Sequence, residues 1–266
     1  MKNYKFILVA IVTLLLSMIP VLFIPNLVGA IIQIIILTIP IFAFGQIKIF
    51  AFSFKSFFAT FVVGGVMTIA TAYYMINSIY KGIHEFGSSA IDSKTLILFI
   101  IFLFITAGMQ EELLTRGFFN TFLRKGFGNT KASYIAATAI SSIFFGLYHL
   151  TNLMSGNDPE AIYSQTIYAI GVGFFLGALY IRTGNLWGNM VLHFLFDFAV
   201  MIYPILFAKM DVATQKGDMI KAWLGEGIVV KSIILTVAAF ALGLFLIRDS
   251  KLKPIIEAEE REEMAA

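Results

Sequence analysis

The sequence predicts an all-α protein that crosses a lipid bilayer about eight times. Of its 266 residues, 59% are hydrophobic and 13% are charged, whereas a soluble domain carries about 25% charged residues. The mean hydropathy is +0.88, and the apolar residues gather in long stretches separated by short polar ones. This composition excludes a large soluble core. The absence of cysteine excludes disulfides, thiol catalysis and Cys-ligated metals.

The predicted spans emerge when hydropathy is averaged over windows of about 19 residues. They cover residues 5–24, 28–44, 57–80, 95–125, 131–150, 160–180, 186–207 and 228–247. The first apolar run has no small-residue cleavage site, so we expect a retained span rather than a signal peptide. The fourth is about 45 Å long as an α-helix, which exceeds the hydrocarbon thickness of a bilayer. The sixth carries Gly173 and Gly177, whose spacing predicts close packing against a neighbouring helix.

The connections are predicted from composition. Residues 46–58 are aromatic-rich and suit an interfacial segment, and residues 81–94 and 209–226 are expected to form polar loops outside the bilayer. Lysine and arginine are enriched in cytoplasmic connections, so their distribution predicts the orientation. With the N-terminus inside, the inner segments hold twelve of them: Lys2, Lys5, Lys48, Lys55, Arg124, Lys125, Lys131, Arg182, Arg248, Lys251, Lys253 and Arg261. The outer segments hold six: Lys81, Lys94, Lys209, Lys216, Lys221 and Lys231. Both termini are therefore expected in the cytoplasm, in a multi-pass protein of the cell membrane.

Several ionisable residues fall inside the predicted spans. A charged side chain costs roughly 2.5–3.5 kcal/mol at the centre of a membrane helix, so intramembrane carboxylates indicate a functional site. Glu111 and Glu112 lie in the fourth span, His149 in the fifth, and His193 and Asp197 in the seventh. Counting along the helices from their inner ends places Glu111, His193 and Asp197 about 15–21 Å deep and His149 somewhat deeper. This shared depth predicts one buried site.

The spacing of these residues assigns them to helix faces. Residues four apart share a face, so His193 and Asp197 are expected to point at one pocket, as are Phe145 and His149. Glu112 and Arg116 are also four apart, with the glutamate first, which favours an ion pair. This pairing leaves Glu111 free to face the cavity. Glu112, Arg116 and Phe145 are accordingly expected to support the site.

Two chemistries fit this set of side chains. A carboxylate and a neutral imidazole around one water form a general base, and a second histidine with its neighbour stabilises an oxyanion, a combination suited to peptide hydrolysis. Alternatively, Glu111, His149 and His193 form a two-histidine, one-carboxylate ligand set for zinc. A non-catalytic immunity or signalling-adaptor protein is a further alternative. A proton-coupled transporter predicts inverted repeats, and the sequence has none that we detect.

Three motifs resemble those of the CAAX protease and bacteriocin-processing family, which includes the Ras-converting endoprotease. They are Glu111-Glu112-x-x-x-Arg116, Phe145-x-x-x-His149 and His193-x-x-x-Asp197. The last position is asparagine in eukaryotic members, so Asp197 favours the prokaryotic branch.

The resemblance implies an eight-helix intramembrane protease with a cavity open toward the cytosol. It implies that Glu111 and His149 activate the water and that His193 and Asp197 bind the oxyanion. Catalysis without a cofactor is favoured, and zinc is the alternative.

The expected substrate is a peptide or protein at the membrane, with prenylated proteins and bacteriocin or pheromone precursors as candidates. The lipid bilayer is the other expected partner, and no nucleic acid is expected, because the net charge of +3 is spread between the spans. The expected domain organisation is a transmembrane protease domain over residues 1–247, with a motif-bearing core at 95–207. A cytoplasmic acidic tail follows over residues 248–266.

Overall fold

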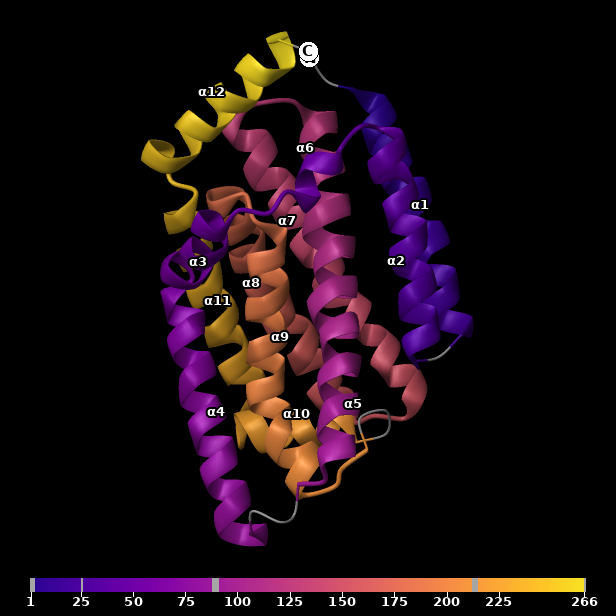
Figure 1. Ribbon diagram of the computed structural model, residues 1–266, viewed down its shortest axis with the longest axis vertical. Helices are drawn as coiled ribbons and strands as arrows, with labels where there is room; N and C mark the ends of the chain where they lie inside the picture. The colour runs from indigo at the N-terminus through magenta and orange to yellow at the C-terminus, as the bar shows by residue number, and fades with distance from the viewer. Residues whose placement is uncertain (1–2, 25, 88–90, 212–214, 266) are drawn as a thin grey trace.

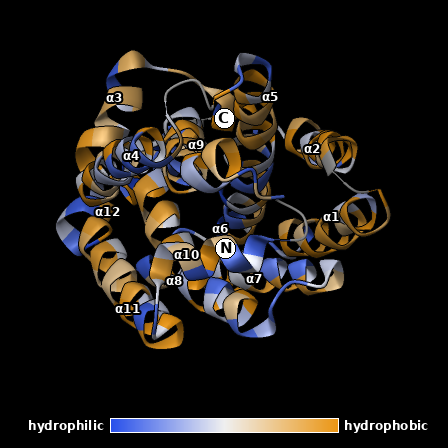
Figure 2. Ribbon diagram, turned by 90° about the horizontal axis from the view of Figure 1, so that it is seen from below, coloured by the Kyte–Doolittle hydropathy of each residue, from blue (hydrophilic) through white to orange (hydrophobic). Residues whose placement is uncertain are grey.

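The computed structural model describes residues 3–24, 26–87, 91–211 and 215–265. Throughout these ranges the regular elements are helices, which confirms the all-α prediction. The long helices run roughly along the long axis of the molecule (Figure 1). Their outward faces are largely hydrophobic, as expected for a lipid-facing surface (Figure 2).

The first two helices form an antiparallel pair at one side of the molecule, where they stand next to the magenta helix α5 and its continuation (Figure 1). They are α1 (Tyr4–Phe23) and α2 (Asn26–Ala43). The Asn3 amide donates a hydrogen bond to the Gly126 carbonyl, at 3.0 Å. The N-terminal end of α1 is therefore fixed beside residue 126, where a later helix ends.

The third predicted span is bent rather than straight, which corrects the prediction of one helix over 57–80. After a short 3₁₀ turn, η1 (Ile47–Phe50), the chain forms α3 (Phe54–Val63) and α4 (Gly65–Phe86), which meet at 77°. The bend falls at Gly64. A Cβ atom there would lie 2.8 Å from the Thr60 carbonyl oxygen and 3.0 Å from Leu179 Cδ2, so the close approach requires glycine. Helix α4 also continues beyond residue 80 and shortens the predicted loop at 81–94.

The fourth span is the long continuous element at the centre of Figure 1. It comprises α5 (Ser93–Leu103), the π-helices η3 (Phe104–Glu111) and η4 (Leu113–Asn120), and α6 (Thr121–Phe127), 35 residues in all. The predicted long helix is confirmed, but its middle is π-helical. Asp92 caps the start of α5 by accepting a hydrogen bond from the Thr95 amide at 2.7 Å, and this bond lowers the pKa of the Asp92 carboxyl.

The next three spans surround the centre of the molecule. They are α7 (Lys131–Tyr148) with the 3₁₀ turn η5 (His149–Ser155), α8 (Pro159–Thr183), and α9 (Leu186–Ile202) with the π-turn η6 (Tyr203–Phe207). Helix α8 is the most buried of the long apolar helices. A Cβ atom at Gly173 would lie 3.0 Å from Phe145, and one at Gly177 would lie 2.7 Å from Thr138, so both glycines permit close packing on α7 as predicted.

The segment predicted as a loop at 209–226 contains a further helix, α10 (Lys216–Leu224). Its apolar residues Met219, Ile220 and Leu224 are buried, which explains why this charged segment folds against the bundle. Lys221 forms an ion pair with Asp158 at 2.9 Å, at the start of α8. This pairing lowers the pKa of Asp158 and raises that of Lys221.

The chain ends with α11 (Ile228–Leu246) and α12 (Asp249–Ala265). Helix α12 includes the predicted acidic tail, and it packs on the bundle: Leu252 is buried, and Glu259 forms an ion pair with Arg124 at 3.2 Å. Both described ends of the chain therefore lie at the α6 end of the molecule. The predicted domain boundary after residue 247 stays a prediction.

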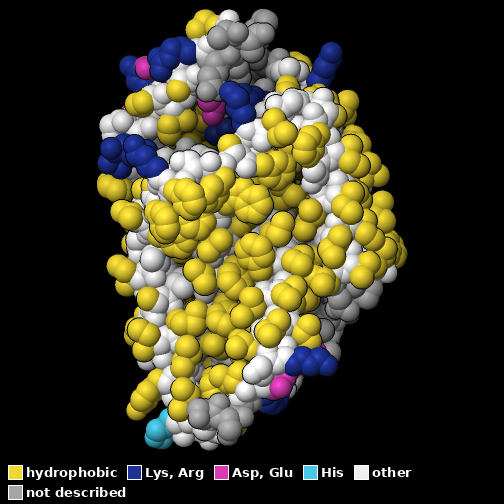
Figure 3. Space-filling model, in the orientation of Figure 1, with side chains coloured by type: hydrophobic (Ala, Val, Ile, Leu, Met, Phe, Trp, Pro, Cys, Tyr) yellow, Lys and Arg dark blue, Asp and Glu magenta, His cyan; other side chains and the backbone are white. Residues whose placement is uncertain are grey.

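Six described helices are long and apolar enough to cross a membrane, and the bent pair α3–α4 makes a seventh. Helix α2 is apolar over residues 27–43, slightly shorter than those six. Together these account for the eight predicted spans. Figure 3 shows the resulting surface, a broad hydrophobic belt with lysine and arginine side chains gathered mainly at one end.

Candidate active site

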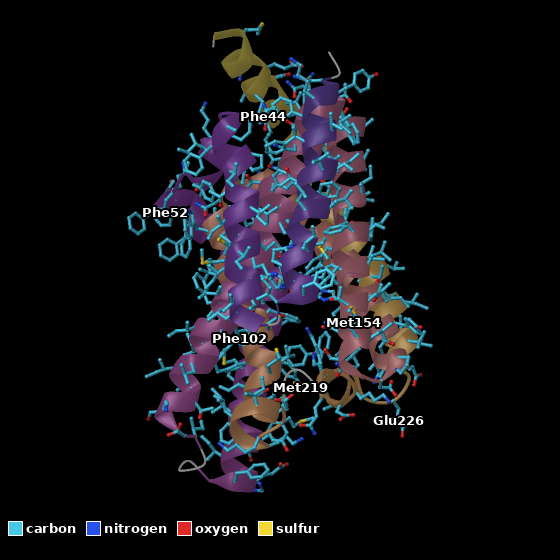
Figure 4. All side chains as sticks on the ribbon, turned by 90° about the vertical axis from the view of Figure 1, so that its right-hand side faces the viewer. Phe44, Phe52, Phe102, Met154, Met219 and Glu226 are labelled. Atoms are coloured by element: carbon cyan, nitrogen blue, oxygen red, sulfur yellow. The ribbon has the colours of Figure 1, made fainter. Side chains whose placement is uncertain are left out.

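A cavity of about 740 Å³ opens at the end of the bundle opposite the chain termini. Its wall includes the far end of α1 at Ile24, the end of η5 at Ser155 and the helix α10 at Met219. Phe102, Met154 and Met219 belong to this wall and lie in the lower half of the molecule in Figure 4. The expectations of cytoplasmic termini and of a cytosol-facing cavity therefore cannot both hold, because the cavity and the termini lie at opposite ends.

The four predicted catalytic residues and Phe145 all line this cavity. Glu111 comes from the end of η3, Phe145 from α7, His149 from the start of η5, and His193 and Asp197 from α9. The two other predicted residues, Glu112 and Arg116, do not line it. Glu111 therefore faces the cavity and Glu112 does not, as expected from their different positions around the helix.

His193 occupies the centre of the charged groups. Its Nε2 atom lies 3.8 Å from Glu111 Oε2 and 3.9 Å from Asp197 Oδ2. The His193 side chain is 5% exposed, whereas Glu111 and Asp197 are 14% and 28% exposed. Both distances exceed a hydrogen bond but suit groups that share a bridging water. The space for a bound molecule is the cavity that all three side chains line.

Glu112 lies behind the cavity in a network of donors. Its carboxylate accepts hydrogen bonds from Arg116 Nη1 at 2.6 Å and from His193 Nδ1 at 2.9 Å, and its second oxygen accepts one from Asn189 at 3.3 Å. The predicted ion pair is present and fully buried, at 0% exposure for Glu112 and 2% for Arg116. Because a carboxylate only accepts, His193 Nδ1 carries the proton of this bond and Nε2 is directed away from Glu112.

Arg116 is held by two further groups of different kinds. Its guanidinium donates to the Gly173 carbonyl at 3.1 Å and lies over the Phe145 ring, 4.6 Å from the centroid. Phe145 in turn contacts both imidazoles edge-on, with centroid distances of 4.9 Å to His149 and 5.9 Å to His193. Phe145 therefore acts as a common support for the arginine and the two histidines.

His149 is placed by the end of a helix. Helix α7 stops at Tyr148, and His149 begins the 3₁₀ turn with its side chain at the cavity wall. His149 is buried, with only 7% of its surface exposed. Within the described part of the chain, no side chain forms a hydrogen bond with its imidazole nitrogens. Its polar atoms are consequently available to a bound molecule.

The π-helical middle of the fourth span changes how Glu111 is presented. A π-helix replaces the usual i to i+4 hydrogen bonds by i to i+5 bonds, and such segments often occur at functional sites. Thr115 Oγ1 donates to the Glu111 carbonyl at 2.5 Å, and Ser141 of α7 donates to the Thr115 carbonyl at 2.7 Å. These side chains satisfy backbone carbonyls around the irregular turn and fix it against α7.

Several polar residues of the site were missed by the sequence reasoning. Asn189 is completely buried and binds both Glu112 and the Leu176 carbonyl. Its position four residues before His193 on the same face was a usable signal. Gln110 donates to Gln33 of α2 at 2.5 Å and to the Tyr148 hydroxyl at 3.0 Å. Gln33 is a polar residue within an apolar span, which was a second usable signal.

The alternative zinc site is not arranged as a ligand set. In the described residues no group of three His, Cys, Asp or Glu side chains could hold one metal ion. The bond from His193 Nδ1 to Glu112 leaves Nε2 at the cavity. Glu111, His149 and His193 nevertheless line one cavity, and the zinc alternative stays a prediction.

The comparison with protein families agrees with the position of this site. Residues 93–199 match the family described as type II CAAX prenyl endopeptidase Rce1-like. The chain carries an Rce1-like domain. This domain extends from the start of α5 into α9 and includes all seven predicted site residues. No curated protein and no solved structure matched the chain.

At the level of the family, the Rce1-like domain is that of a membrane-embedded CAAX endopeptidase. The resemblance expected from the three motifs is thereby confirmed. A membrane-associated protein or peptide is the corresponding class of substrate.

Proposed function

We propose that this protein hydrolyses a peptide bond of a membrane-associated substrate in the cavity, with Glu111 and His149 activating the attacking water. The observation that carries the proposal is the convergence of Glu111, His149, His193 and Asp197 on one cavity of about 740 Å³. A volume of this size accommodates a short stretch of peptide. Ionisable groups at membrane depth are costly and favour a functional explanation.

The water has a defined place in this proposal. Glu111 Oε2 and His193 Nε2 are 3.8 Å apart at the cavity wall, so a water that enters the cavity can hydrogen-bond to both. Glu111 takes a proton from this water as its oxygen attacks the carbonyl carbon of the scissile bond. His149, with free ring nitrogens at the same cavity, positions the water and relays the proton toward the leaving amine.

The oxyanion formed by this attack requires donors. His193 donates through Nε2 when both of its nitrogens carry protons, because Nδ1 is committed to Glu112. Asp197, 3.9 Å from Nε2, contributes a second donor when its carboxyl is protonated. We assign Glu112 and Arg116 as positioning residues that hold the ring of His193, since neither lines the cavity.

A second role for His193 is favoured by one observation. The Glu112 carboxylate on Nδ1 gives a carboxylate–histidine pair whose neutral form has an accepting Nε2 directed to the cavity. In that form His193 acts as the base in place of Glu111. The slope of the pH–rate profile distinguishes the two roles.

We propose that the reaction needs no resident metal, because Glu111 and the two histidines supply a base and hydrogen-bond donors of their own and the described residues hold no group arranged as a metal-ligand set. Elemental analysis of chelator-washed, active enzyme tests this. Stoichiometric zinc in that preparation, together with loss of activity on its removal, would contradict it.

The central experiment compares purified wild type with Glu111→Gln and His149→Ala. The probes are a farnesylated CAAX peptide and a non-prenylated membrane peptide library. We expect cleavage to fall by about 10²–10⁴-fold, which is the usual contribution of general acid–base groups. Glu226→Gln is the matched control, because Glu226 is exposed and lies outside the cavity wall.

Thermal unfolding confirms that each variant is folded. Retained turnover in both folded variants would refute the proposal. If Glu111→Gln still supports the biological phenotype of the wild type, the protein acts by binding rather than by catalysis. Comparison of the peptides released by wild-type and Glu111→Gln strains then identifies the natural substrate.

A further inference from the structure

The cavity and the chain termini lie at opposite ends of the bundle. The termini end is defined by the Asn3–Gly126 hydrogen bond and by the ion pair of Arg124 with Glu259 of α12. The cavity end is defined by the last residues of α1, the turn η5 and α10. In Figure 1 the former is at the top and the latter at the bottom. Whichever side of the membrane holds the termini, the cavity opens on the other.

The two ends differ in charge. Among the described residues, the termini end holds eleven lysines and arginines. The cavity end holds six lysines, on or beside α4, α5, α10 and α11. It also holds seven acidic residues: Glu85, Asp92, Asp158, Glu160, Asp211, Asp218 and Glu226. The cavity end is thus close to neutral, whereas the termini end is basic even when the six acidic residues of the α12 sequence are counted.

The positions of these basic residues in the structure support the same orientation. Lys48 lies in η1, Lys55 in the first turn of α3 and Arg182 in the last turn of α8, so the basic residues of the termini end come from several segments and not from one tail. These are the short connections on which the positive-inside rule depends. At the cavity end, Lys221 is paired with Asp158 at 2.9 Å and Lys81 lies 4.1 Å over the Tyr203 ring. The rule therefore places the termini end in the cytoplasm.

We propose that the cavity opens on the non-cytoplasmic side of the membrane and takes its substrate there. This inference rests on the proposed function for the existence of a substrate, but the orientation stands on geometry and charge alone. The substrate class that follows is a peptide segment that has crossed the membrane or emerges from it on that side. A lipidated C-terminus that stays in the cytosol does not reach this opening.

The chemistry of the cavity wall fits such a segment. One part is apolar, formed by Leu22, Phe102 and Met154, of which Met154 is largely exposed. Another part is polar and includes Asp211 and Lys216. A peptide at the membrane boundary offers an apolar stretch to the first and a hydrated stretch to the second. Its scissile bond then lies beside Glu111 and His193.

The absence of cysteine makes the orientation directly measurable. Single serine-to-cysteine changes alter one atom, and exposed serines are present at both ends. Ser93→Cys and Ser155→Cys report on the cavity end, and Ser53→Cys and Ser250→Cys on the termini end. Each full-length variant is expressed in bacterial cells and treated with a membrane-impermeant maleimide, before and after lysis.

We expect the two cavity-end cysteines to be labelled in intact cells and the two termini-end cysteines only after lysis. The reverse pattern, or labelling of all four positions in intact cells, overturns the proposal. Labelling does not depend on cleavage. If the cysteines are labelled as expected but the enzyme cleaves no substrate, only the proposed function is refuted. If the enzyme is active but the labelling is reversed, only the proposed orientation is refuted.

A second measurement tests access to the cavity itself. In intact cells that cleave a reporter peptide, a bulky impermeant maleimide on Ser155→Cys should reduce cleavage, since Ser155 belongs to the cavity wall. The same reagent on Ser250→Cys should leave cleavage unchanged. Undiminished cleavage by fully labelled Ser155→Cys enzyme would contradict entry of the substrate from that side.

Discussion

Replacing one partner of the buried Glu112–Arg116 pair should destabilise the fold, whereas replacing both should restore stability without restoring activity. The charged atoms are 2.6 Å apart, and neither side chain is more than 2% exposed. At an effective dielectric constant of about 20 their attraction amounts to roughly 6 kcal/mol. Desolvation offsets much of this, so the pair itself contributes little net stability.

The single variants remove the attraction but keep one desolvated charge. Glu112→Gln leaves the Arg116 guanidinium with the Gly173 carbonyl and the Phe145 ring. We expect a loss of about 3–5 kcal/mol, as for other buried pairs from which one partner is removed. Arg116→Met should cost less, because Glu112 keeps His193 and Asn189 as donors.

The double variant Glu112→Gln/Arg116→Met removes both charges and should recover most of the stability. His193 then bonds to a neutral amide oxygen in place of a carboxylate. The difference between a charged and a neutral hydrogen bond is about 1–1.5 kcal/mol, equivalent to about a tenfold loss of turnover. The assay combines thermal unfolding in detergent with cleavage of a reporter peptide.

Two results would refute this reasoning. If Glu112→Gln were as stable as the wild type, other groups would have to stabilise the buried charge of Arg116. Full activity in the double variant would mean that the bond from His193 to Glu112 has no role in positioning the imidazole.

Three further predictions concern packing and chemistry. Gly171→Ala should destabilise the fold by about 1–3 kcal/mol, because its Cβ would lie 2.4 Å from the Thr236 backbone of α11. Gly65→Ala is the control: its Cβ would meet open space, so thermal unfolding should show wild-type stability. Equal stability of the Gly171 and Gly65 variants would argue against the close contact between α8 and α11. Asp197→Asn should retain activity because the amide still donates a hydrogen bond, whereas Asp197→Ala should lose about 10²–10³-fold; an inactive Asn variant would show that the carboxylate charge is required. If His193 donates to the oxyanion, turnover should fall as the pH rises, because the imidazole then loses its second proton. If His193 instead acts as the base, turnover should rise with pH over the same range of the pH–rate profile.

The sequence was sufficient to predict the parts of this molecule that depend on local pattern. The long apolar stretches predicted the spans, and the four-residue spacing predicted the Glu112–Arg116 pair. The shared depth of Glu111, His149 and His193 predicted that they meet at one cavity, and all three line it. The catalytic roles of these residues stay predictions.

Other features depend on contacts between distant segments and could not be predicted from local pattern. The π-helical course of residues 104–120 is stabilised from outside, by the Ser141 hydroxyl on the Thr115 carbonyl. The bend at Gly64 depends on the side chains of Leu179 and Leu192, which are far away in sequence. The helix α10 had a usable signal in the spacing of Met219, Ile220 and Trp223, which the surrounding charges obscured.

Helix α10 separates two tasks that many enzymes combine. The groups proposed to react are fixed on long spans within the bundle, whereas Lys216, Met219 and Trp223 form part of the cavity wall from a short helix outside them. This helix is followed by Gly225 and Gly227, both with positive φ, which turn the chain sharply into α11. Substitutions on α10 can therefore alter which peptides fit while the geometry around Glu111 is preserved. Related chains can diverge in their substrates through this one helix and retain a common reaction.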